Sequence, residues 1–162
     1  MKNVTMLLLL ILGLTVSNSL QSQTITVSGV KIDFGNSFED YGNLWDENSR
    51  IESDNIFVHV YESEFGLGCF YENKLYSLIM TANNNEVYPV NQEVEEILIN
   101  IDPFESESVS DEYSSMYNEY FKTDEFYIIK SSMRMNTDYT IVSINLINEI
   151  REKYPDFLIK LF

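Results

Sequence analysis

The chain has 162 residues, of which 10 are Lys or Arg and 26 are Asp or Glu, so its formal net charge at pH 7 is −16. Nucleic acids and anionic lipids bind to basic surfaces, so the acidity of this chain argues against both as partners. Strong acidity favours solubility and, in a binding protein, a basic partner.

The first 22 residues have the pattern of a secretory signal peptide. Lys2 supplies the positive start, residues 6–16 form a short apolar run, and small side chains follow at residues 17–19, where a signal peptidase cleaves. The apolar run is too short to span ~30 Å of hydrocarbon, which argues against a membrane anchor. We therefore expect an extracytoplasmic protein, periplasmic or secreted, without stable membrane insertion after cleavage. Residues 23–162 are expected to form one domain.

Alternation and turn residues predict the strands of the first half. Residues 24–32 alternate between apolar and polar side chains and predict a single strand with Gly29 at a bulge. Residues 55–82 read as a three-stranded antiparallel meander, in which β-branched and aromatic residues are frequent. Gly66 and Asn73 supply the backbone freedom that the two turns of this meander require.

Three helices are predicted, over residues 37–46, 110–122 and 145–154. The first begins at Ser37, a typical N-cap, and the third ends before Pro155. The second follows the N-cap Ser110 and carries an apolar stripe at helical spacing, made of Tyr113, Met116, Tyr117, Tyr120 and Phe121. Such a stripe is more typical of a core face than of a binding surface.

Further strands are predicted over residues 97–101, 126–131 and 139–144, the last two as a long hairpin. The order of elements indicates an α+β fold: a mostly antiparallel sheet with about three helices packed on it. The chain has a single cysteine, so this fold contains no internal disulfide.

The only histidine and the only cysteine, His59 and Cys69, lie in the predicted meander. With a three-residue loop in the first hairpin, they would face each other with Cβ atoms ~5 Å apart, as in a nucleophilic thiolate–imidazole pair. A slip of one residue would put them on opposite faces. The alternative is a buried structural thiol beside a hydrogen-bonded histidine.

Two acidic stretches, residues 46–54 and 105–112, are read as loops, and loops commonly carry binding residues. Their candidate binding residues are Asp46, Glu47, Glu52, Asp54, Glu105, Glu107, Asp111 and Glu112. The same carboxylates could gather around Ca²⁺, although no EF-hand motif is present and no metal site is assigned. The alternative is that these stretches only keep the protein soluble.

No phosphate-binding glycine loop, G-x-S-x-G or H-E-x-x-H motif occurs, and no cofactor is expected. The sequence therefore favours an exported, acidic, non-enzymatic binding module that engages a basic protein, as an inhibitor or an immunity protein does. Two alternatives stay open. One is a small secreted hydrolase that uses carboxylates or the His59–Cys69 pair, and the other is a carbohydrate- or calcium-binding module.

Overall fold

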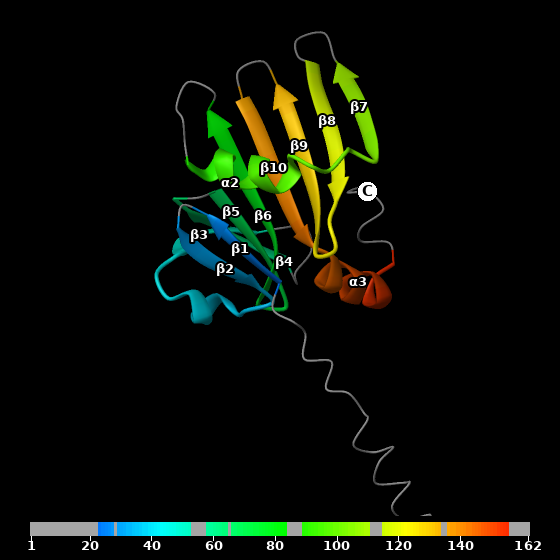
Figure 1. Ribbon diagram of the computed structural model, residues 1–162. Helices are drawn as coiled ribbons and strands as arrows, with labels where there is room; N and C mark the ends of the chain where they lie inside the picture. The colour runs from blue at the N-terminus through cyan, green and yellow to red at the C-terminus, as the bar shows by residue number, and fades with distance from the viewer. Residues whose placement is uncertain are drawn as a thin grey trace, which may run out of the picture.

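A computed structural model gives the structure of the chain and describes residues 23–27, 29–52, 58–64, 66–83, 89–110, 115–133 and 136–155. Strands account for about 61% of these residues. They form one two-stranded and one eight-stranded sheet, both antiparallel (Figure 1). The fold is therefore mostly β, and the prediction of an α+β domain with about three helices is wrong. None of the helices within the described residues is both long and apolar enough to cross a membrane.

The eight-stranded sheet consists of two four-stranded meanders joined where β6 pairs with β10. The first meander comprises β3 (Asp46–Glu52), β4 (Val58–Ser63), β5 (Gly66–Tyr71) and β6 (Lys74–Asn83). The second comprises β7 (Glu105–Ser110), β8 (Ser115–Lys122), β9 (Phe126–Met133) and β10 (Asn136–Ser143). Because each meander folds back from the junction, β3 and β7 become the two edges of the sheet.

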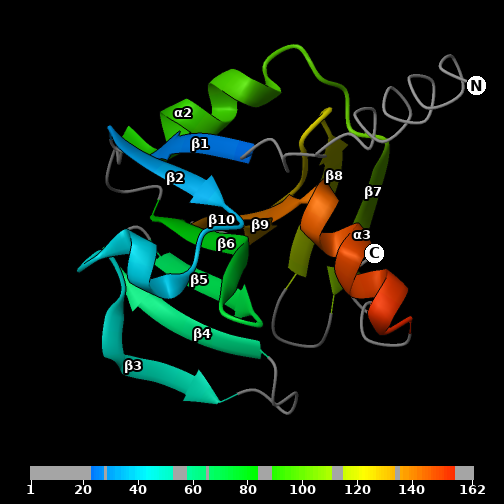
Figure 2. The same cartoon turned by 90° about the horizontal axis from the view of Figure 1, so that it is seen from below.

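The remaining elements cover this sheet. Strands β1 (Gln23–Val27) and β2 (Val30–Phe34) form a hairpin, which lies with α2 (Pro89–Leu98) on one face (Figure 2). Helix α3 (Ile144–Lys153) directly follows β10 at one end of the sheet. The core between these layers is apolar, and its fully buried side chains include Phe70, Leu78 and Ile147.

Of the two β predictions for the first half, the meander is confirmed in outline and the single strand is wrong. The meander predicted for residues 55–82 corresponds to β4, β5 and β6, and its first three residues lie outside the described residues. The single strand predicted for residues 24–32 is instead the β1–β2 hairpin. Gly29, predicted to lie at a bulge, sits in the hairpin turn with φ +77°, a backbone conformation that favours glycine.

The helix predicted for residues 37–46 is reduced to one 3₁₀ turn, η1 (Phe38–Tyr41). Its start is as predicted, because the backbone N–H and the hydroxyl of Ser37 each donate to Asp40 Oδ2 at 2.8 Å. Gly42 has φ +59° and ends the turn, so that the chain leaves toward β3.

The helix predicted for residues 110–122 is wrong. Residue 110 ends β7, residues 115–122 form β8, and residues 111–114 lie outside the described residues. Successive side chains of β8 point to opposite faces of the sheet: Phe121 is buried in the core, whereas its neighbour Tyr120 donates a hydrogen bond to Glu107. Tyr and Phe also favour strands over helices.

Of the remaining predictions for the second half, one strand is wrong, and a hairpin and a helix are confirmed. The strand predicted for residues 97–101 is wrong, because residues 89–98 form α2, with Pro89 at the first helical position that proline favours. The hairpin of β9 and β10 and the helix predicted for residues 145–154 are confirmed, the latter as α3. Ser143 caps α3 by accepting a hydrogen bond from the N–H of Leu146 at 3.2 Å.

Both edges of the large sheet carry acidic side chains. In β7 every residue is exposed, and Glu105 and Glu107 alternate with serines. At the other edge, β3 begins with Asp46 and Glu47, and its pairing with β4 is interrupted by a bulge. Charges and bulges on edge strands prevent them from pairing with another chain. On this argument, the acidity of the two edge strands protects them from pairing with another chain.

This role predicts the behaviour of a β7 variant. Replacing Glu105 and Glu107 together by valine should cause self-association, because it leaves an uncharged edge of high β-propensity. Sedimentation velocity over a range of concentrations measures this against the unmodified protein. Replacing Ser106 and Ser108 by valine is the matched control, since it adds the same side chains but keeps both charges. Equal association of the two variants would contradict a protective role of charge.

Candidate binding site

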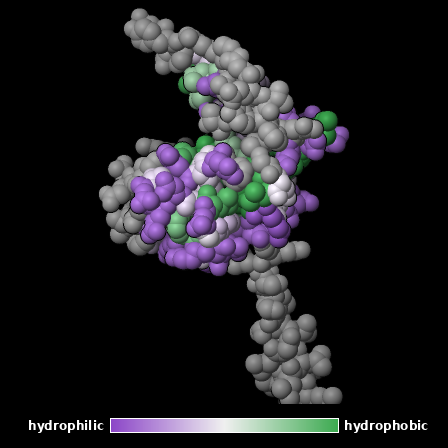
Figure 3. Space-filling view, turned by 90° about the vertical axis from the view of Figure 1, so that its left-hand side faces the viewer, coloured by the Kyte–Doolittle hydropathy of each residue, from purple (hydrophilic) through white to green (hydrophobic). Residues whose placement is uncertain are grey.

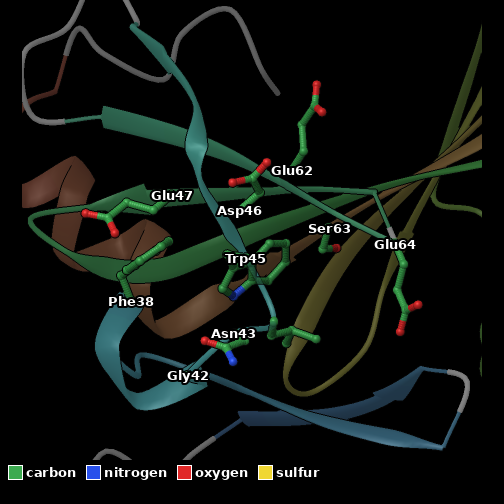
Figure 4. A pocket seen from close by; sticks show the side chains of 10 residues that line it. Phe38, Gly42, Asn43, Trp45, Asp46, Glu47, Glu62, Ser63 and Glu64 are labelled. Carbon is green, nitrogen blue, oxygen red and sulfur yellow. The ribbon is translucent and has the colours of Figure 1, made fainter.

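A cleft of about 770 Å³ lies beside η1, between the segment that leads into β3 and the end of β4 (Figure 4). Its lining residues are Phe38, Gly42, Asn43, Leu44, Trp45, Asp46, Glu47, Glu62, Ser63 and Glu64. Ligand pockets of proteins commonly have volumes in the range of roughly 300–1,000 Å³. Hydrophilic residues surround a smaller hydrophobic area on the side of the molecule where β2 and β3 lie (Figure 3).

An irregular β3–β4 pairing shapes one wall of this cleft. Asp46 pairs with Glu62, but the next register pair is Ile51 with Val60, so residues 47–50 bulge out of the ladder. The bulge is held by hydrogen bonds. The Glu62 N–H donates to Ser49 Oγ at 2.7 Å, and the Asn48 N–H donates to Asp46 Oδ1 at 2.9 Å. The first residue of the bulge, Glu47, lines the cleft.

Aromatic side chains form the base. Trp45 is only 3% exposed, and its ring packs edge-on against Phe70 and Tyr41, with centroid separations of 5.7 and 6.0 Å. Phe38 packs on Tyr61 at 4.3 Å. Such contacts between aromatic rings stabilise a base of fixed shape.

The packing of Trp45 depends on a glycine and leaves one polar atom unpaired. A Cβ at Gly68 would lie 2.7 Å from Cζ3 and from Cη2 of the indole, so only glycine leaves enough room for the ring at this position. The indole Nε1 is buried and has no hydrogen-bond acceptor among the described residues. A buried, unpaired N–H is uncommon in native proteins and calls for an explanation.

The rim of the cleft is strongly negative. Asp46, Glu47, Glu62 and Glu64 are all exposed there, and the ten lining residues include no Lys, Arg or His. Asp46 and Glu62 are register partners, so these two acidic residues lie directly opposite each other on neighbouring strands. Like charges in this position destabilise a sheet, and a cation placed between them would relieve their repulsion.

The structure separates the candidate binding residues predicted from the sequence. Asp46 and Glu47 line the cleft, whereas Glu105 and Glu107 lie on β7 at the opposite edge of the sheet. Glu52 closes β3, while Asp54, Asp111 and Glu112 lie outside the described residues. The two acidic stretches were expected to be loops, and their described parts are mainly edge strands instead.

Sequence reasoning missed Glu62, Glu64 and Trp45 as parts of the site. Glu62 lies near the end of β4 and Glu64 lies in the turn that follows, whereas Trp45 falls within the helix predicted for residues 37–46. Within the described ranges, no group of three or more His, Cys, Asp or Glu side chains is arranged to hold a metal ion.

The proposed nucleophilic pair of His59 and Cys69 does not form. His59 pairs with Phe70 and Val60 pairs with Cys69, so the histidine and the cysteine lie on opposite faces of the sheet. The reason is the hairpin turn: Ser63 pairs with Gly66, which leaves a two-residue loop instead of the three-residue loop that was assumed.

Cys69 has the properties of a structural thiol. It is 7% exposed, and burial raises the pKa of its thiol to about 11. Because a raised pKa favours the neutral form, the thiol's contribution to folding stability is fully present below the unfolded pKa of ~8.5 and is lost as the pH rises toward 11.

We therefore expect Cys69 to react slowly with a disulfide reagent in the folded protein at pH 8, and about tenfold faster for each unit of pH up to about 11. The rate in denaturant is the reference for an accessible thiol. A folded-state rate close to that reference at pH 8 would show that the thiol is accessible and ionised.

Comparison of the chain with protein-family models gives no match, and neither do comparisons with curated proteins and with solved structures.

Proposed function

We propose that this chain is an exported, non-enzymatic binding protein that takes up a basic protein partner at the acidic cleft. The observation that carries the proposal is the cleft itself, in which four exposed carboxylates surround an aromatic base. The most specific version of this proposal is that the chain inhibits or neutralises a basic extracytoplasmic protein. Export rests on the signal pattern of residues 1–22, and the intact mass of the mature protein tests it.

The cleft suits binding better than catalysis. A carboxyl group that acts as a catalytic acid is usually kept protonated by burial in an apolar site. Here Asp46, Glu47, Glu62 and Glu64 are exposed, and no lining residue is a histidine or a cysteine that could act as a base or a nucleophile.

Long-range electrostatics favour the same class of partner. Loss of Lys2 with the signal leaves 9 Lys and Arg against 26 Asp and Glu, a net charge of 9 − 26 = −17. A charge of this size accelerates the encounter with a cationic protein at low ionic strength. At physiological ionic strength the attraction is screened over ~8 Å, so only carboxylates near the contact keep their effect.

The test starts with capture of partners from the extracytoplasmic fraction of the source at low salt, followed by association rates at increasing ionic strength. Neutralising the cleft pair, Glu62→Gln with Glu64→Gln, should slow association about tenfold and flatten its salt dependence. The control removes the same charge at the opposite edge, Glu105→Gln with Glu107→Gln, and should change the rate much less.

Three results would overturn the proposal. They are the capture of no basic protein, a partner that binds at a rate indifferent to salt, and equal effects of the cleft and control variants. The last result would assign recognition to overall charge rather than to the cleft.

A further inference from the structure

The indole N–H of Trp45 is directed away from the sheet. The atoms Cε3, Cζ3 and Cη2 face Gly68 on β5, and Nε1 lies on the opposite edge of an indole ring. Figure 4 shows this nitrogen on the side of the ring that faces Asn43 and Phe38, two residues that line the cleft. A buried donor is expected to have an acceptor, and a ligand bound in the cleft is the candidate source of the one that the described residues do not supply.

Two further features restrict what can enter. The opposed carboxylates of Asp46 and Glu62 favour a cation, and the planar guanidinium of arginine can bind two carboxylates with paired hydrogen bonds. Phe38 and Leu44 are only half-buried at the cleft wall, where they can contact the methylene groups of a long basic side chain.

A free cation satisfies only part of this site, because the head groups of lysine and arginine donate hydrogen bonds and cannot accept one. The indole N–H requires an acceptor, and the closest acceptor to a basic side chain in any protein is a main-chain carbonyl of the same segment. The volume of about 770 Å³ is enough for a basic side chain together with its adjoining main chain.

We propose that the cleft recognises an extended segment with an arginine, whose guanidinium lies between the carboxylates of Asp46 and Glu62 while a neighbouring main-chain carbonyl accepts from Trp45 Nε1. This inference rests on the function proposed above, since it names the element of the basic partner that the cleft binds. Carbohydrates, whose hydroxyls both donate and accept, are the competing class of ligand.

Trp45 is the only tryptophan of the chain, so its fluorescence reports on the cleft alone. The probe is the blocked tripeptide acetyl-Gly-Arg-Gly-amide, titrated into the millimolar range at constant ionic strength. We expect a saturable change in emission. The same peptide with citrulline, which keeps the shape of arginine but has no charge, should bind at least tenfold more weakly.

Variants of the rim test the charge contact. Glu62→Gln should weaken binding of the arginine peptide about fivefold to tenfold and leave the citrulline peptide unchanged. The double variant Glu105→Gln with Glu107→Gln is the control for net charge and should bind both peptides as the unmodified protein does.

Methylguanidinium tests the carbonyl contact, since it has the cation of arginine and no acceptor. It should bind more weakly than the tripeptide and leave the emission of Trp45 nearly unchanged. Measured by calorimetry, Trp45→Phe should remove this preference for the tripeptide while methylguanidinium binds as before. If this variant does not fold, the comparison of the two probes on the unmodified protein still decides the point.

Several outcomes would overturn the inference. They are equal binding of the arginine and citrulline peptides, equal binding of methylguanidinium and the tripeptide, and saturable binding of cellobiose or chitobiose in place of the peptides. If the arginine peptide does not bind but the captured partner still depends on Glu62 and Glu64, this inference fails and the proposed function stands. If the partner is also indifferent to these residues, both fail.

Discussion

Replacing Gly66 by alanine is expected to remove most of the stability of the protein. Gly66 has φ +132°, where residues with a side chain are strained, and an added Cβ would lie 2.1 Å from the carbonyl oxygen of Ile79. The obstructing atom belongs to the backbone of β6, so no side chain can turn away to relieve the clash. Separating β5 from β6 at this point disrupts the first meander, and we expect a loss of ~3 kcal/mol or more from a total that is typically ~5–15 kcal/mol.

Urea unfolding at 25 °C measures this loss, with Gly29→Ala as the matched control. Gly29 also has positive φ, +77°, but an added Cβ there meets no atom within 4 Å. The control should therefore lose only the cost of the backbone conformation, ~1 kcal/mol. If both variants lost the same free energy of unfolding, the contact of the added Cβ with Ile79 would have no measurable effect on stability.

The parts of the fold that sequence analysis predicted are those in which consecutive elements pair with each other. The β4–β5–β6 meander, the β9–β10 hairpin and α3 are each specified by their own alternation, turn residues or caps, and each is observed. The joining of the two meanders depends on pairs such as Leu78 with Ile141, which are distant in the sequence. No local pattern predicts such a pairing.

The largest error, a helix in place of β8, has a physical cause. Tyr117, Tyr120 and Phe121 fit a helical stripe, but aromatic residues that lie on both faces of a half-covered strand give the same spacing. Tertiary pairing decided the outcome, because β8 lies between β7 and β9 and joins its backbone hydrogen bonds to both. A helix here would have left the second meander without its connecting strand.

The cleft was only partly visible in the sequence for a related reason. Asp46 and Glu47 stood out as members of an acidic stretch, whereas Glu62 joins them only through the irregular register of β3 and β4. The stretch at residues 105–112 looked equivalent, yet the topology sends it to the opposite edge of the sheet. Composition identified acidic segments, but only the pairing of strands determined which carboxylates share a site.

Replacing Gly68 by alanine is expected to damage the fold and the cleft together. The backbone at Gly68 does not require positive φ, so the effect comes from contact alone. The added Cβ would lie 2.7 Å from the Trp45 ring, which Phe70 and Tyr41 hold in place from other sides. Overpacking of this kind typically costs ~1–3 kcal/mol. Because the ring must move, its Nε1 would no longer have its position in the cleft, and the emission of this single tryptophan should shift to longer wavelength.

A double-mutant cycle separates this contact from general damage to β5. Trp45→Leu removes most of the ring, so adding Gly68→Ala to it should cost much less than Gly68→Ala costs in the unmodified protein. Residues in direct contact commonly show coupling energies of ~0.5–3 kcal/mol in such a cycle. Urea unfolding of the four proteins gives the coupling, and the fluorescence of Gly68→Ala gives the position of the ring. Additive losses, together with unchanged emission in Gly68→Ala, would mean that Trp45 does not rest on this glycine and that the base of the cleft is held in another way.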